Sequence, residues 1–167
     1  DSVRKLGNGW RLPLGPLRES PKRLKTVDAI LLNGSAFEAD WLPSPKSYAI
    51  ELKPTAWRHI ESDKIYPLGH LNIDQAQAFA AIGNPQRFFS TLRQLGFGGT
   101  THAFPDHHAF QQGDFSDVGE RLLLMTEKDA VKVRAFAQKN WWSLVVEMDL
   151  PESFLNVIFE ALPQQSS

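Results

Sequence analysis

The chain has 167 residues, of which 42% are hydrophobic and 22% charged, a composition typical of a globular protein with a buried core. Eighteen basic and nineteen acidic side chains give a formal net charge of −1, so the basic excess of a nucleic-acid-binding protein is missing and no nucleic acid partner is expected. Cysteine is absent, which excludes disulfides and thiolate metal sites, and no apolar run approaches the roughly 20 residues of a membrane-spanning helix.

The first half of the chain predicts a buried strand and then a small antiparallel excursion. Residues 27–34 are largely apolar and end in an Asn-Gly pair, as a strand before a tight turn does. A stretch with spaced prolines follows, and its alternating segments 47–52 and 55–60 predict two short antiparallel strands. Aromatic and apolar side chains from Phe37 to Trp57 predict a hydrophobic cluster in this hairpin, with a surface for acyl chains as the alternative.

From residue 76 onward, predicted strands alternate with predicted helices. Asn84 is the expected cap of a helix that Gly96 ends, and Thr126 is the expected cap of the next helix. The predicted strands cover residues 76–82, 100–104, 121–125 and 141–148, and the predicted helices cover residues 85–95, 127–138 and 152–162.

This alternation predicts an α/β fold with a largely parallel sheet flanked by helices. We expect a single α/β domain over residues 1–162 and a frayed polar tail over 163–167. Ligands of such sheets bind at the carboxyl ends of the strands. Three polar turns follow predicted strands directly, namely Gly-Asn-Pro, Pro-Asp-His-His and Thr-Glu-Lys-Asp, so we expect them to form one site.

Two of these turns predict anion-binding groups. Asn84 precedes a helix whose first N–H groups attract phosphate, and Arg87 adds a cation in the same turn. Lys128 stands at a helix start, where the macrodipole disfavours a cation, which indicates a partner such as phosphate or a carboxylate. The alternatives are a well-capped helix with an exposed Arg87, and ordinary capping of the second helix by Thr126 and Asp129.

The third turn, with Asp106, His107 and His108, offers acid–base chemistry. A histidine can act as a general base or orient a carboxylate. The three side chains can also ligate a metal, although adjacent histidines seldom point at one ion, and a plain surface loop is the alternative. His102, on the preceding strand, is predicted to be structural.

A glycine- and proline-rich segment over residues 7–20 carries Arg18 and Glu19. Its restricted path can hold both side chains in place, the guanidinium for phosphate oxygens and the carboxylate for a magnesium ion. The alternative is a loop in which both side chains are solvated.

Five segments occur in an order that resembles the second half of the tetraacyldisaccharide 4'-kinase family, from Asp1 to about Val133: GNGWRLPLGPLRE, VDAILLNG, AFAAIGNPQRFF, FPDHH and LLLMTEKDAVK. The resemblance implies a P-loop-kinase-like fold. It also implies ATP- and magnesium-dependent phosphorylation of the 4'-hydroxyl of a tetraacylated glucosamine disaccharide 1-phosphate, in lipid A biosynthesis. The implied place of action is the cytoplasmic face of the bacterial inner membrane, with the membrane surface and the lipid A precursor as partners.

The resemblance implies roles for particular residues as well. His107, beside Asp106, pairs with a catalytic aspartate of the other half of the enzyme, while Arg18 and Glu19 lie beside the phosphates and the metal. Ala81 departs from the family, which usually has glycine there.

No G-x-x-x-x-G-K-[ST] segment occurs in the sequence, and the first residue is not Met. We therefore expect the carboxy-terminal part of such a kinase, without the ATP phosphate loop, and inactive without the remaining amino-terminal half. The alternative is a non-catalytic binding or interaction module that retains the fold of this half.

Overall fold

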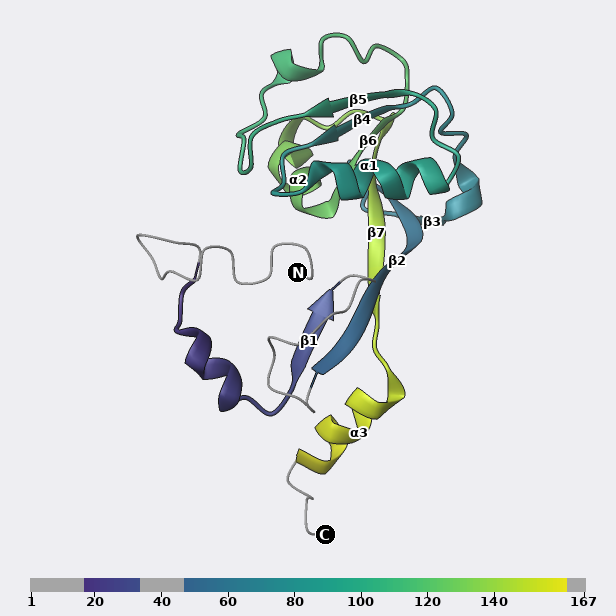
Figure 1. The fold of residues 1–167 in the computed structure, drawn as a ribbon. Coiled ribbons are helices and arrows are strands. Elements are labelled where there is room, and N and C mark those ends of the chain that lie inside the picture. Colours follow the sequence, from purple (N-terminus) through teal and green to yellow (C-terminus); the bar gives the residue numbers. More distant parts are fainter. Residues whose placement is uncertain (1–16, 34–46, 162–167) are drawn as a thin grey trace. The chain divides into compact units, whose positions relative to one another are not determined.

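The computed structural model describes residues 17–33 and 47–161 (Figure 1). The chain divides into two compact units. The smaller unit comprises Asp1–Lys53 and Met148–Ser167, and the larger unit comprises Pro54–Glu147. The expectation of one domain over residues 1–162 stays a prediction, and the tail at 163–167 lies outside the described residues.

The smaller unit contains a 3-10 helix, Pro21–Lys25, the strand β1, Ile30–Asn33, and the helix α3, Glu152–Ala161. The strand β1 is shorter than the predicted segment 27–34, because residues 26–28 still form a bend after the 3-10 helix. It runs parallel to the first residues of β2, with Ile30 opposite Ser47. The predicted Asn-Gly turn reaches beyond the described residues.

The strand β2, Ser47–His59, is continuous over 13 residues, so the prediction of two short strands at 47–52 and 55–60 is wrong. Pro54 lies in the gap between the two predicted segments. Proline lacks an N–H, yet Pro54 lies between the stretch that pairs with β1 and the stretch that pairs with β3, where that N–H is not needed for either ladder. The predicted antiparallel excursion exists, but it is formed by β2 with β3, Ile65–Pro67.

The larger unit is built on a parallel sheet, as predicted. Its strands lie in the order β7-β6-β4-β5, with the end of β2 beside β7. All three pairs within this parallel group are in register over three or four residues. The strands are β4, Gln77–Ala80, β5, Thr100–Ala103, β6, Leu123–Thr126, and β7, Trp141–Asp149.

Side chains of these strands alternate between the two faces of the sheet, and each face has its own apolar cover. Figure 1 shows the helix α1, Pro85–Gln94, and the segment 104–122 on opposite sides of β4 and β5. The α1 face contains Ala78, Ala80, Leu124, Trp142 and Leu144, packed with Phe88, Phe89 and Leu92. The other face contains Phe79, Ala81, Leu123, Met125 and Trp141, packed with Phe110, Phe115, Val118, Ala130 and Val133.

Both predicted helix caps are confirmed. The Asn84 side chain accepts the N–H of Arg87, and α1 ends before Gly96, whose φ of +94° suits glycine. The Thr126 hydroxyl accepts the N–H of Asp129 at the start of α2, Glu127–Val133.

The helix α2 ends five residues before the predicted boundary at residue 138. The chain continues as a 3-10 turn, Arg134–Phe136, in which the Phe136 ring comes to 6.0 Å from the ring of Trp141. The helix therefore ends where the chain turns to pack on the sheet, although its local sequence predicts a helix up to residue 138.

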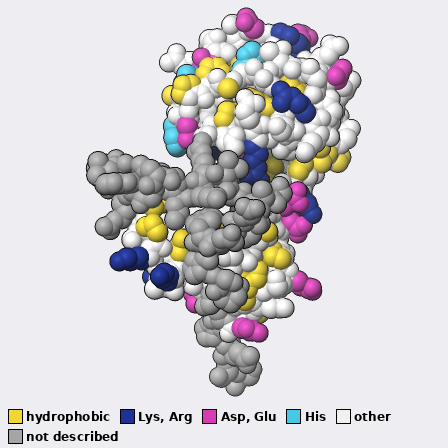
Figure 2. Space-filling model, in the orientation of Figure 1, with side chains coloured by type: hydrophobic (Ala, Val, Ile, Leu, Met, Phe, Trp, Pro, Cys, Tyr) yellow, Lys and Arg dark blue, Asp and Glu magenta, His cyan; other side chains and the backbone are white. Residues whose placement is uncertain are grey.

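Charged side chains of both signs are scattered over the visible face of the larger unit (Figure 2). Within the described ranges, no helix combines the length and the apolar character needed to cross a membrane.

Candidate functional site

The loops that follow β4, β5 and β6 meet at one edge of the parallel sheet. The N–H of Phe104 donates to the carbonyl of Ala80 at 2.9 Å, and the N–H of His107 donates to the carbonyl of Ala81 at 3.3 Å. These bonds join the loop after β5 to the loop after β4. The contact between Lys128 and Asp106 adds the turn after β6, so the three polar turns lie at one edge. We call Asp106, His107 and Lys128 the strand-end cluster.

Lys128 has a carboxylate as its partner. Its Nζ lies 3.2 Å from Oδ1 of Asp106, which spans the loops after β6 and β5. The hydrogen bond from Lys128 is the main reason why the pKa of Asp106 lies below its ordinary value, with the charge of Lys128 and the neighbouring His107 adding to it. Asp106 is therefore an anion at neutral pH, and it neutralises a cation that the helix dipole alone disfavours.

His107 has a left-handed backbone, with φ of +65°, and 77% of its side chain is exposed. Its Nε2 lies 3.8 Å from Oδ2 of Asp106. Left-handed φ values are uncommon outside glycine and persist where the surroundings enforce them, often at functional sites. The conformation presents the imidazole to solvent beside a carboxylate.

His108 points elsewhere, as the sequence predicted for adjacent histidines. Its Nε2 lies 3.0 Å from Oδ2 of Asp114, and its ring packs on Phe104 and Phe110 at 4.7 and 5.1 Å. Asp114 also accepts the N–H of Gln111, and these two bonds lower the pKa of its carboxyl. His108 is part of the packing of its loop.

Asn84 and Arg87 begin α1, directly after the loop that receives His107. Asn84 uses its side-chain oxygen to cap the helix. His102 is structural, as predicted: its ring stacks on Phe79 at 4.3 Å, and its Nε2 lies 2.9 Å from Oε1 of Gln77.

A buried ion pair behind this edge was not predicted from the sequence. Asp129, expected only as a capping residue, has no exposed surface, and its Oδ1 lies 2.7 Å from Nζ of Lys132. Its Oδ2 accepts the N–H of Ala81 at 3.0 Å and the hydroxyl of Thr126 at 2.9 Å. The signal was an acidic and a basic residue at i and i+3 on a helix face that also carries Val133, so both point toward the core.

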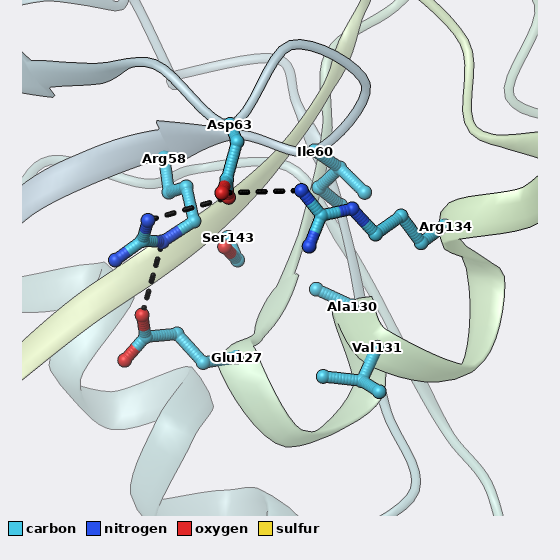
Figure 3. A pocket seen from close by; sticks show the side chains of 8 residues that line it. All are labelled: Arg58, Ile60, Asp63, Glu127, Ala130, Val131, Arg134 and Ser143. Atoms are coloured by element: carbon cyan, nitrogen blue, oxygen red, sulfur yellow. Dashed lines mark hydrogen bonds and ion pairs between the residues drawn. The ribbon is translucent and has the colours of Figure 1, made fainter.

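A pocket of about 270 Å³ lies elsewhere in the larger unit, between α2 and the turn after β2 (Figure 3). Its charges are paired with one another. Asp63 lies between two arginines, 3.3 Å from Arg58 and 3.1 Å from Arg134, and Arg58 also lies 3.3 Å from Glu127. With two cations matched by two carboxylates, these side chains offer no excess charge to a ligand.

Arg18 and Glu19 belong to the smaller unit and are exposed. Glu19 lies 3.4 Å from the guanidinium of Arg23, four residues further along the chain. In the part of the chain that the structure describes, no three His, Cys, Asp or Glu side chains are placed to bind one metal ion. The described residues thus do not assemble a metal site by themselves, and Glu19 as a magnesium ligand stays a prediction.

Comparisons with known proteins agree with one another. The family model of tetraacyldisaccharide-1-P 4'-kinase matches residues 1–163. A tetraacyldisaccharide 4'-kinase of Hydrogenovibrio crunogenus is 46% identical over 164 residues, which are 97% of this chain and 48% of the relative. The enzyme of that name from Pseudomonas aeruginosa is 47% identical over 148 residues, which are 88% of this chain and 43% of the relative.

Among solved structures, the fold is similar to that of LpxK from Aquifex aeolicus in complex with ATP. The TM-score is 0.60 and the identity 22%, and the match covers 92% of this chain and 48% of that one. At this identity the likeness shows the fold. The chain spans about half the length of the curated relatives it matches.

Proposed function

The chain belongs to the tetraacyldisaccharide 4'-kinase family, and on this premise we propose that it works as the carboxy-terminal part of an ATP-dependent kinase. The substrate is tetraacyldisaccharide 1-phosphate, the lipid A precursor, and the acceptor is its 4'-hydroxyl. The family membership and the position of the strand-end cluster support this proposal. The remaining amino-terminal half of the enzyme supplies the ATP phosphate loop.

The proposed chemical role depends on one observation, the position of the His107 side chain. Its imidazole is exposed at the carboxyl ends of the strands, the edge at which parallel sheets bind ligands. An imidazole there can accept the proton of an alcohol, or can hold a carboxylate that does so. We infer the second role, with an aspartate of the amino-terminal half as the base. Asp106, whose Oδ2 lies 3.8 Å from Nε2 of His107, adds a second negative charge beside the imidazole.

Positive groups near this edge suit the transferred phosphoryl group. Lys128 is already positioned by Asp106, and the first turn of α1, with Asn84 and Arg87, provides a helix N-terminus. In phosphoryl transfer the protein mainly positions groups and stabilises charge. We therefore assign Lys128, Asn84 and Arg87 to substrate or phosphate binding, together with Arg18 from the smaller unit.

Magnesium is the ion that ATP-dependent phosphoryl transfer uses, and it would neutralise charge on the phosphates. We propose Glu19 as one ligand, with further ligands from the rest of the enzyme. We also propose the cytoplasmic face of the bacterial inner membrane as the place of action, which the family resemblance implies; an acylated substrate partitions into a membrane.

The test compares His107→Ala with His108→Ala in the full-length protein that carries this chain. Phosphate transfer from ATP to the disaccharide is measured at saturating substrates. His107→Ala is expected to lower kcat by about 10²- to 10⁴-fold, the range for acid–base groups. His108→Ala is expected to lower kcat less than about tenfold, because His108 bonds Asp114 and faces its own loop.

A larger loss of kcat in His108→Ala than in His107→Ala would show that the proposal assigns the role to the wrong histidine. Unchanged turnover in both would make the Asp-His-His turn a surface loop. If the wild-type full-length protein transfers no phosphate at all, the alternative of a non-catalytic binding module replaces the proposal.

A further inference from the structure

Ala81, the first residue after β4, is fully buried and has both of its backbone polar groups bonded to distant parts of the chain. Its N–H donates to Oδ2 of Asp129 at 3.0 Å. Its carbonyl accepts from Nζ of Lys132 and from the N–H of His107, each at 3.3 Å. One residue therefore connects the buried ion pair of α2 to the backbone of His107.

The ion pair itself is held from several sides. The Thr126 hydroxyl donates to Asp129 and also accepts its N–H, at 2.9 and 3.2 Å. Lys132 lies 2.7 Å from the same carboxylate, with only 22% of its side chain exposed. A carboxylate out of water is strongly destabilising unless it is paired and hydrogen-bonded, so few other arrangements of these groups are open.

His107 needs such support. A left-handed backbone at a residue other than glycine is held by its surroundings. The bond from its N–H to the Ala81 carbonyl is one constraint, and the bond that Lys128, also on α2, donates to the neighbouring Asp106 is a second.

We propose that the buried Asp129–Lys132 pair is a positioning device for the site: it fixes the Ala81 carbonyl, which keeps His107 in its left-handed conformation with the imidazole exposed at the strand ends. The inference rests on the proposed role of His107 in phosphoryl transfer. Asp129 and Lys132 are positioning residues, since neither needs to touch a substrate.

A purely structural role for the pair predicts something different. If the role is structural, breaking the pair lowers the free energy of unfolding and leaves kcat per folded molecule unchanged. If the role is positioning, breaking the pair lowers kcat in folded protein, and it does so only while His107 is present. The coupling between the two positions separates the two cases.

The experiment uses the full-length protein with Lys132→Met, with His107→Ala, and with both changes. Turnover is measured where circular dichroism shows every variant to be folded. Lys132→Met is expected to lower kcat about 10-fold or more with KM for ATP changed less than about threefold, since small misplacements of a reacting group are costly. In the His107→Ala background, Lys132→Met is expected to lower kcat less than about twofold further.

The matched control is Arg134→Met, which removes a cation from an ion pair of 3.1 Å in the same unit. Arg134 pairs with Asp63, on the turn after β2, and we expect no change in kcat. Lys132→Arg keeps a cation beside Asp129 and is expected to stay within about threefold of the wild type. Should Lys132→Met fail to fold, Asp129→Asn takes its place, because it keeps an acceptor for the Ala81 N–H.

A second readout does not depend on activity. The three-bond coupling between the amide and α protons reports φ, so the backbone of His107 can be followed by NMR in each variant. We expect the coupling of His107 to change in Lys132→Met and to stay the same in Arg134→Met.

The inference would be overturned if the double variant lost kcat by the product of the two single losses. It would also be overturned if the three-bond NMR coupling of His107 stayed unchanged in Lys132→Met. If His107→Ala alone leaves kcat unchanged, the proposed function is at fault instead. The NMR coupling then still decides whether the pair controls the conformation of His107.

Discussion

Asp129 illustrates what single residues reveal from sequence and what they conceal. A polar residue three positions after Thr126 indicates a helix start, and the cap is found where it was predicted. The Asp129 carboxylate also binds Lys132 and the N–H of Ala81, which lies 48 residues away in the sequence. Local patterns predict the cap between Thr126 and Asp129, while only the assembled sheet creates the contact with Ala81.

The same limit applied to the two histidines of the strand-end loop. Their adjacency predicted diverging side chains, and the structure confirms this: His107 is exposed, and His108 packs on Phe104 and Phe110. The left-handed backbone of His107 was not predictable, because it depends on the bond to the Ala81 carbonyl on another strand.

His102 gives the protein a pH-dependent stability. Burial is the main reason why its pKa in the folded state lies below its ordinary value, with Asp117 opposing and Arg121 adding to the shift. As the pH falls through about 6.5, His102 therefore binds a proton more readily in the unfolded chain than in the folded protein. Stability contributed by neutral His102 is present at higher pH and is lost as the pH falls below that value.

His102→Gln is expected to reduce this loss, because it replaces a titrating side chain by a neutral one that can still donate to Gln77. The free energy of unfolding is measured by chemical denaturation from pH 7.5 to 5. Parallel curves for the wild type and His102→Gln would show that His102 does not contribute to the pH dependence.

At the scale of the elements, helix starts and strand positions were predictable, and continuity and helix length were not. Asn84, Gly96 and Thr126 act through groups within three or four residues, so the sequence contains the whole signal. Pro54 is different, because whether proline ends a strand depends on which neighbouring strands need its N–H. The stretches of β2 that pair with β1 and with β3 both leave Pro54 out, and β7 also lies beside β2.

A close approach of two backbones limits the turn before β5. A Cβ on Gly99 would lie 1.8 Å from the carbonyl oxygen of Ala76, which is backbone and cannot rotate away. Gly99→Ala is therefore expected to destabilise the protein by about 1–3 kcal/mol. The control is Gly69→Ala, since a Cβ there would meet nothing within 4 Å.

Thermal or urea unfolding of the two variants provides the measurement. We expect a clear fall in the midpoint for Gly99→Ala and little change for Gly69→Ala. Equal midpoints would mean that the turn before β5 relaxes without loss.

For the whole molecule, the order of five segments predicted the family, and the strand–helix alternation predicted the largely parallel sheet. The division into two units was not predicted, because β2 and β7 each belong to both, and a continuous strand has no boundary signal in its sequence. Arg18 and Glu19 lie in one unit and the strand-end cluster in the other, so their joint action stays a prediction.

The 167-residue chain is expected to show no kinase activity without the rest of the enzyme. It contains no G-x-x-x-x-G-K-[ST] segment to bind the phosphates of ATP. The assay incubates the purified chain with ATP and the disaccharide, with the full-length protein as the positive control. Measurable transfer by the chain alone would show that its own residues suffice for the reaction.

The left-handed backbone of His107 has a consequence for how this position can evolve. Glycine adopts that conformation without the penalty that a side chain brings, and the exposed imidazole of His107 contributes little packing of its own. Glycine there would relax the backbone while deleting the group assigned to phosphoryl transfer. Selection for thermal stability thus favours glycine at this position, while selection for turnover favours histidine. A relative freed from catalysis would drift toward glycine or asparagine at this position, which makes the residue found there a marker of retained activity.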